Sequence, residues 1–174
     1  MIISLSGFMG CGKSTVGRLL QERLPDFELV DLDEFIEEGD GRTIAEIFAE
    51  DGEKAFREME ADAVECMMMV YGATGRDVIL SLGGGTLMNA ENAKTLMANT
   101  EIFYLKATVD TLVENLQGAE DGRPMLSGGE DLRTKIEGLM RKRSATYEKV
   151  AHHVIVTDGR DCGDVAQEIA DIVR

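Results

Sequence analysis

Gly7-Phe8-Met9-Gly10-Cys11-Gly12-Lys13-Ser14-Thr15 is the stretch of sequence that decides the fold of this chain. It fits the phosphate-binding loop (P-loop) pattern, in which a glycine and four variable residues precede Gly-Lys-Ser or Gly-Lys-Thr. Residues 2–6 before it form an apolar-rich run of the length of a buried strand, and residues 16–20 after it are typical of a helix. Strand, glycine-rich loop and helix in this order are the context that the pattern requires, which disfavours an ordinary glycine-rich turn.

The residue types in this loop suit a phosphate ligand. Glycines let backbone N–H groups turn toward a phosphate without a clash from Cβ, and the following helix adds unpaired donors and a favourable dipole. We expect Lys13 to reach the β- and γ-phosphates, and the Ser14 hydroxyl to ligate Mg²⁺. The loop therefore predicts that the protein binds a nucleoside triphosphate, and it says nothing about a second substrate.

Composition restricts the partners of the chain. The sequence has 174 residues, which favours one domain with a full core. It carries 18 basic and 33 acidic residues, a formal charge of −15, which argues against non-specific binding to nucleic acid or anionic membranes. If the substrates are anions, the few cations must be concentrated at the site.

The cysteines and the apolar runs indicate the compartment. The three cysteines form no Cys-x-x-Cys pair and are odd in number, which favours free thiols in a reducing cytosol. We recognise no signal peptide, and no apolar stretch approaches the roughly 20 residues of a membrane span. We therefore expect a cytoplasmic protein.

Short apolar runs alternate with helical periodicity along the chain. Strands are predicted at residues 2–6, 27–31, 78–82, 102–105 and 153–156. Such near-continuous apolar runs suit strands that are buried on both faces. Apolar residues at a spacing of three to four predict a last helix over about 165–173, and Thr43 resembles the start of a capping box. The alternation predicts an α/β fold, an open parallel sheet with helices on both faces.

Two acidic residues, Asp31 and Asp33, stand at the end of the second predicted strand. Alternation along a strand puts both side chains on the same side, and ligands of open α/β sheets bind beyond the carboxyl ends of the strands. One carboxylate can orient water around Mg²⁺, and the other can accept a hydroxyl proton. The alternative is that Asp33 only caps the following short helix.

Arg57 and Glu60 lie three residues apart on a helix predicted over about 53–70. They share a face and can pair, and a guanidinium held by a carboxylate can bind a substrate carboxylate bidentately. A solvated ion pair is the simpler interpretation from these two residues alone. Gly83-Gly84-Gly85, directly after the third strand, permits either close approach of the backbone to a ligand or a flexible turn.

The polar segment 117–130 has neither a helical nor a strand period, and a loop of that length is typical of a lid or a disordered segment. Arg123 lies in it, and such lids carry arginines that stabilise a transferring phosphoryl group; a surface turn is the alternative. Arg143 lies toward the end of a helix predicted to run from about Glu130 to Tyr147. Nothing in the local sequence separates it from Arg141 and Lys142, which also suit a helix C-terminus.

Together these elements resemble the shikimate kinase family over nearly the whole chain. The resemblance rests on the Gly7–Thr15 loop, Asp-Leu-Asp at 31–33, the stretch from Ile47 to Arg57, Glu60, the triple glycine at 83–85, Arg-Pro-Met-Leu at 123–126, and Arg143 four residues before Tyr147. The P-loop alone marks a very large superfamily. The later elements in this order and spacing are far more specific.

The resemblance implies transfer of the ATP γ-phosphoryl group to the 3-hydroxyl of shikimate, with Mg²⁺, in aromatic amino acid biosynthesis. It implies a three-layer P-loop kinase fold, a five-stranded parallel sheet and a small monomer. It implies a lid at about 115–128 and a substrate-binding helical segment at about 33–62. The roles that it implies are nucleotide binding by Gly10, Cys11, Gly12, Lys13, Ser14, Thr15 and Arg123; metal binding by Ser14 and Asp31; shikimate binding by Asp33, Arg57, Glu60, Gly83, Gly84, Gly85 and Arg143; and catalysis by Lys13, Asp33 and Arg123.

The sequence departs from the family pattern in the lid. Met125 stands where leucine is more common, and the residues before Arg123 are acidic where we expect basic character. Other P-loop small-molecule kinases, such as gluconate or nucleoside monophosphate kinases, remain alternatives, although they are not expected to carry this arginine and glycine set. A non-catalytic nucleotide-binding regulator is a second alternative, and a GTPase is disfavoured because no Asn-Lys-x-Asp motif occurs.

Overall fold

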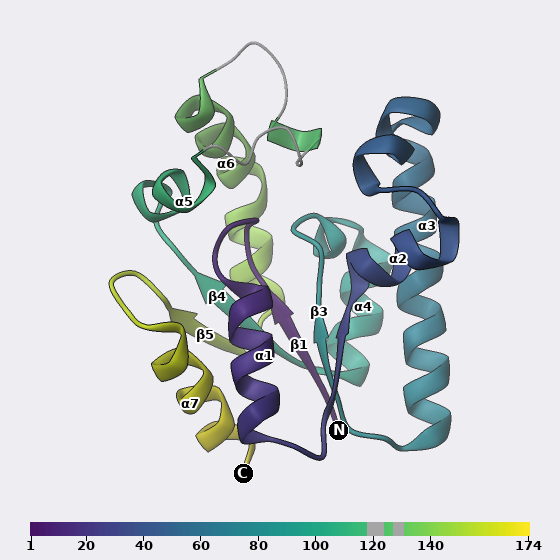
Figure 1. The fold of residues 1–174 in the computed structure, drawn as a ribbon, viewed down its shortest axis with the longest axis vertical. Coiled ribbons are helices and arrows are strands. Elements are labelled where there is room, and N and C mark those ends of the chain that lie inside the picture. The colour runs from purple at the N-terminus through teal and green to yellow at the C-terminus, as the bar shows by residue number, and fades with distance from the viewer. Residues whose placement is uncertain (118–123, 127–130) are drawn as a thin grey trace.

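A computed structural model describes residues 1–117, 124–126 and 131–174. Its centre is a five-stranded sheet of order β2-β3-β1-β4-β5, in which every pairing is parallel (Figure 1). The strands are β1 (Ile2–Ser6), β2 (Glu28–Asp31), β3 (Val78–Ser81), β4 (Glu101–Lys106) and β5 (His153–Val156). The predicted parallel sheet is therefore confirmed, and the strand ends differ from those predicted by no more than one residue.

Helices cover both faces of the sheet. On one face lie α1 (Lys13–Arg23) and α7 (Cys162–Val173), and on the other lie α3 (Ile44–Thr74), α4 (Ala90–Asn99) and α6 (Leu132–Val150) (Figure 1). The short helices α2 (Leu32–Asp40) and α5 (Val109–Leu116) and the 3₁₀ turns η1 (Thr86–Met88) and η3 (Pro124–Leu126) complete the described elements. Within these ranges, no helix combines the length and the apolar character needed to cross a membrane.

The central strand carries the P-loop on a rigid support. Ile3 and Leu5 on β1 are fully buried between the two helical layers. Because β1 pairs with β3 on one side and β4 on the other, its backbone groups are hydrogen-bonded along both edges. A strand held on all sides fixes the position of the loop that follows it.

The helix that carries Arg57 is longer than the predicted range. The capping box at Thr43 is confirmed, because its hydroxyl accepts from the Glu46 N–H at 3.1 Å and the Glu46 carboxylate accepts from the Thr43 N–H at 2.8 Å. The helix that begins there is kinked at Gly52, whose φ of 86° lies outside helical geometry, and it then runs on to Thr74. Helix α6 likewise continues to Val150, past the predicted end at Tyr147.

Candidate active site

The P-loop ends at a helix N-terminus that is open to an anion. Helix α1 begins at Lys13, and its N-cap is Gly12 at φ 101°, so no side chain caps it and its first turn has no acidic residue. The N–H groups of the first turn are therefore available to a ligand. Gly10, at φ 81°, lies so close to Leu116 that an added Cβ would sit 2.6 Å from the leucine Cγ. Only glycine fits at this position.

Lys13 lies folded over its own loop. Its ammonium donates to the Gly7 carbonyl at 2.8 Å and to the Phe8 carbonyl at 3.2 Å. Both acceptors are neutral, so phosphate oxygens would be stronger partners for the charge. Lys13 is therefore held beside the loop, ready to turn to a bound anion.

A cavity of about 470 Å³ opens over the loop. Five of the six predicted loop residues line it, together with both predicted aspartates: Gly10, Gly12, Lys13, Ser14, Thr15, Asp31 and Asp33. Cys11 does not line it, because its thiol is buried and its N–H donates to the Phe8 carbonyl at 3.1 Å. A nucleotide-binding role for Cys11 stays a prediction.

Both aspartates line the cavity, but they do not lie on one strand as we expected from strand alternation. Strand β2 ends at Asp31 and α2 begins at Leu32, so Asp33 lies in the first turn of a helix. The capping role considered for Asp33 belongs to Asp31, whose carboxylate accepts from the Glu34 N–H at 3.1 Å. Asp33 is thereby left free to face the site.

Asp33 is held in surroundings that disfavour its charge. Burial raises its pKa from 3.8 to about 6, and the nearby carboxylates of Asp31 and Glu60 add to this, while the Lys13 ammonium opposes it. A carboxyl group that titrates near pH 6 can accept a proton under near-neutral conditions more readily than an ordinary aspartate.

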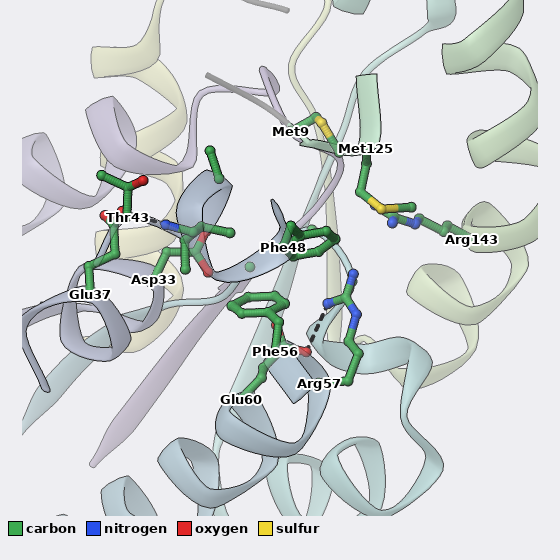
Figure 2. Close-up of a pocket in the computed structure, with 15 residues that line it drawn as sticks. Met9, Asp33, Glu37, Thr43, Phe48, Phe56, Arg57, Glu60, Met125 and Arg143 are labelled. Atoms are coloured by element: carbon green, nitrogen blue, oxygen red, sulfur yellow. Dashed lines mark hydrogen bonds and ion pairs between the residues drawn. The ribbon is translucent and has the colours of Figure 1, made fainter. Parts of the chain in front are cut away.

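A second cavity, of about 400 Å³, is drawn in Figure 2. The predicted acceptor-site residues line it: Asp33, Arg57, Glu60, Gly83, Gly84, Gly85 and Arg143. In Figure 2, Arg57 and Arg143 lie on one side of this cavity and Asp33 on the other. The structure thus brings together residues from four separate parts of the chain.

Arg57 forms an ion pair with the buried carboxylate of Glu60. The Arg57 Nη1 lies 2.9 Å from the Glu60 Oε1, and the glutamate side chain is 1% exposed. The glutamate half of the pair is therefore removed from water, while Arg57 is 25% exposed and also lies 3.6 Å from the exposed Glu53 carboxylate. The glutamate fixes the guanidinium and partly compensates its charge, so that one edge of Arg57 can face the cavity.

Arg143 differs from its neighbours by burial. It is 5% exposed, whereas Arg141 and Lys142 are exposed. Its guanidinium carbon lies 5.7 Å from the centre of the Phe8 ring, and within the described residues its Nη1 has no hydrogen-bond partner. A buried guanidinium nitrogen without an acceptor favours binding of an anion.

The triple glycine lets the backbone approach both arginines. An added Cβ at Gly85 would lie 2.6 Å from guanidinium nitrogens of Arg57, and one at Gly84 would lie 3.3 Å from the Arg143 Nη1. The Gly84 carbonyl also accepts from the Tyr147 hydroxyl, one helical turn beyond Arg143. These glycines therefore allow the backbone to lie against the two arginines, and its close approach to a ligand stays a prediction.

The two cavities share part of their lining. Met9, Asp33, Gly83 and Gly84 line both. Asp33 therefore stands where a ligand on the P-loop and a ligand on the arginines would meet. This geometry suits transfer of a group between two bound molecules.

Two side-chain contacts at the site were not predicted from the sequence. The Asn115 side-chain amide, at the end of α5, donates to the Gly10 carbonyl at 2.9 Å, and the Thr86 hydroxyl donates to Glu60. Neither residue belongs to a motif, and the residues of each pair are far apart in the sequence. Arg123 lies outside the described residues, as do parts of the predicted lid.

Comparisons with known proteins agree with this geometry. The family model described as shikimate kinase matches residues 9–174. A shikimate kinase of Rhodococcus jostii is 41% identical over 167 residues, which is 95% of this chain and 93% of that protein. One of Symbiobacterium thermophilum is 38% identical over 172 residues, 98% of this chain and 95% of that protein.

A solved structure is also similar over the whole length. The shikimate kinase of Acinetobacter baumannii, determined in complex with shikimate, superimposes with a TM-score of 0.90 at 32% identity, covering 99% of this chain and 92% of that one. The sequence match, the fold and the arrangement of the site agree: this chain belongs to the shikimate kinase family.

Proposed function

We propose that this protein transfers the γ-phosphoryl group of ATP to the 3-hydroxyl of shikimate, producing shikimate 3-phosphate for aromatic amino acid biosynthesis. The observation that carries the proposal is the shared lining at Asp33. One adjoining cavity has a P-loop and the other has two arginines, the buried Arg143 and the partly exposed Arg57, a combination that fits a nucleoside triphosphate and a small carboxylate. Family membership supports the choice of shikimate as that carboxylate.

The nucleotide half of the site would bind ATP through backbone and charge. The first-turn N–H groups of α1 and the Lys13 ammonium would hold the β- and γ-phosphates. Ser14 and Asp31 supply the hard oxygen donors that Mg²⁺ prefers, so these residues fit the ion that the family implies. Bound Mg²⁺ would neutralise charge on the phosphates.

The acceptor half would bind shikimate through its carboxylate. Arg143 offers a buried nitrogen without a partner among the described residues, and Arg57 is oriented by Glu60. Gly83, Gly84 and Gly85 would let the ring lie close to the backbone. The carboxylate would thereby fix the substrate with its hydroxyls directed toward Asp33.

Transfer then needs alignment and removal of one proton. The substrate oxygen would attack the γ-phosphorus as the bond to the β-phosphate oxygen breaks and ADP leaves, and Asp33 would accept the hydroxyl proton. We further propose that Arg123, on a lid at about 115–128, stabilises the transferring group. We also propose that residues 1–174 act as one monomeric domain in which residues 33–62 bind shikimate.

The choice of acceptor is tested by a coupled assay of ADP release with shikimate, quinate, gluconate or AMP. We expect Mg²⁺-dependent turnover with shikimate, and at most slow turnover with the others, because only shikimate matches the family's acceptor. Turnover with another acceptor and none with shikimate would overturn the proposal. ATP binding without turnover on any acceptor would instead favour a nucleotide-binding regulator.

The raised pKa of Asp33 predicts that the protein loses stability as the pH rises. Its pKa is raised to about 6 in the folded state from 3.8, so the stabilising contribution of the protonated carboxyl is full below pH 3.8 and lost as the pH rises through about 6. Asp33→Asn removes this titration. We expect the free energy of unfolding of Asp33→Asn, relative to the native protein, to rise by about 1 kcal/mol between pH 5 and pH 8. Urea unfolding at both pH values measures it, and a constant difference would contradict the assignment.

A further inference from the structure

Glu60 has a second buried partner besides Arg57. Its Oε2 accepts from the Thr86 hydroxyl at 2.9 Å, while its Oε1 faces Arg57 at the same distance. Thr86 is 0% exposed. A carboxylate removed from water is costly unless its oxygens are paired, and in this chain each oxygen of Glu60 has its own donor.

Thr86 is itself held in place from two directions. Its N–H closes a turn by donating to the Gly83 carbonyl at 3.3 Å, and its carbonyl accepts from the buried Asn92 side chain at 3.2 Å. An added Cβ at Gly83 would lie 3.1 Å from both the Thr86 Oγ1 and the Glu60 Oε2. The Thr86 hydroxyl therefore contacts the Glu60 carboxylate next to the glycine turn, and hydrogen bonds of the Thr86 backbone fix its position.

We propose that Thr86 is a positioning residue for the acceptor site: its hydroxyl orients the Glu60 carboxylate, which orients Arg57 toward the carboxylate of shikimate. This inference rests on the proposed function. Without the hydroxyl, the carboxylate loses one of its two anchors and can rotate, so Arg57 loses the fixed orientation of its closer ion pair and keeps the longer one, at 3.6 Å to the exposed Glu53. The chain of contacts runs from α4 through η1 to α3 and ends at the cavity wall, without touching the P-loop.

The test separates this role from ordinary packing. Thr86→Val and Thr86→Ala remove the hydroxyl, with and without an apolar group in its place, and Thr86→Ser keeps it. Because a hydrogen bond to a charged group contributes substantially to the free energy, we expect the KM for shikimate to rise by about tenfold in both hydroxyl-free variants. We expect kcat and the KM for ATP to change by less than about twofold, and Thr86→Ser to be near native.

Thr100→Val is the matched control. Thr100 is also a buried threonine, 7% exposed, and its hydroxyl donates to the Leu96 carbonyl at 2.8 Å, away from the site. We expect Thr100→Val to lower the thermal midpoint without changing either KM. If Thr86→Val does not fold, Thr86→Ala supplies the same measurement without placing a methyl group against the carboxylate.

A double variant tests the route through Arg57. If Thr86 acts through that arginine, Thr86→Val should change the KM for shikimate by less than about twofold in an Arg57→Ala background. Native KM in the hydroxyl-free variants, or the full effect in the Arg57→Ala background, would overturn the inference while the native enzyme still phosphorylates shikimate. Absence of shikimate turnover in the native enzyme would instead overturn the proposed function, and this inference with it.

Discussion

Replacing Lys13 by alanine is expected to lower kcat/KM for shikimate phosphorylation by about a thousandfold. The phosphoryl group carries charge that spreads over its oxygens during transfer, and Lys13 is the cation of the P-loop. Its present acceptors are the Gly7 and Phe8 carbonyls and, at 3.9 Å, the Cys11 sulfur, so within the described residues they all belong to the P-loop itself. The loss should appear with any acceptor, because the lysine acts on the donor. Steady-state kinetics with shikimate, and basal ATP hydrolysis, measure it.

Lys94→Ala is the control for loss of a positive charge. Lys94 is exposed on α4, and its removal changes the net charge of this acidic chain by the same amount. We expect Lys94→Ala to keep near-native kinetics. A Lys13→Ala enzyme with a folded circular dichroism spectrum and turnover within about tenfold of native would contradict the assigned role.

The parts of the molecule that could be predicted from sequence are those specified by local chemistry. The strand before the P-loop is apolar and short, the loop needs its glycines, and the capping box at Thr43 places both hydrogen-bonding groups within four residues. Each of these signals acts over a few neighbouring residues. They predicted the parallel sheet, the capping box at Thr43 and the nucleotide-binding loop.

The structure differs from the sequence-based expectations where tertiary packing determines whether a side chain is buried. The pair of Arg57 and Glu60 is a solvated pair or a buried one depending on what covers it, and that cover comes from η1 and the triple glycine. Arg143 has the same local sequence signals as Arg141, yet only one of the two turns inward. Family resemblance, and not spacing, identified it in the sequence.

One difference concerns the residues directly after β2, which are helical rather than extended. Alternation along β2 predicted that Asp31 and Asp33 point the same way, but α2 begins at Leu32. The helix start assigns the capping role to the first aspartate and directs the second into the cavity. The helix start thus gives Asp31, the proposed metal ligand, a capping role as well, and leaves Asp33 as the proposed base.

Replacing either arginine of the acceptor site is expected to weaken shikimate binding, but the two replacements should differ in their effect on stability. Arg143→Met should raise the KM for shikimate by about a hundredfold, because it removes charged hydrogen bonds to the substrate carboxylate. Arg57→Ala should raise it by a similar factor. Both variants should keep the KM for ATP near native, since neither residue lines the nucleotide cavity. Initial rates with each substrate varied in turn measure both constants.

Stability separates the two variants because the arginines have different partners in the free protein. Arg57→Ala leaves the Glu60 carboxylate, 1% exposed, without its ion-pair partner, so we expect the free energy of unfolding to fall by about 3 kcal/mol. Arg143 has a buried Nη1 without a partner within the described residues, and methionine restores an apolar side chain of similar length. Arg143→Met should therefore be at least as stable as the native protein in urea while it binds shikimate poorly. A destabilised Arg143→Met would contradict this division, because it would mean that the Arg143 charge is stabilised in the free protein. An Arg57→Ala variant of native stability would also contradict it, because it would mean that the buried Glu60 carboxylate does not depend on Arg57.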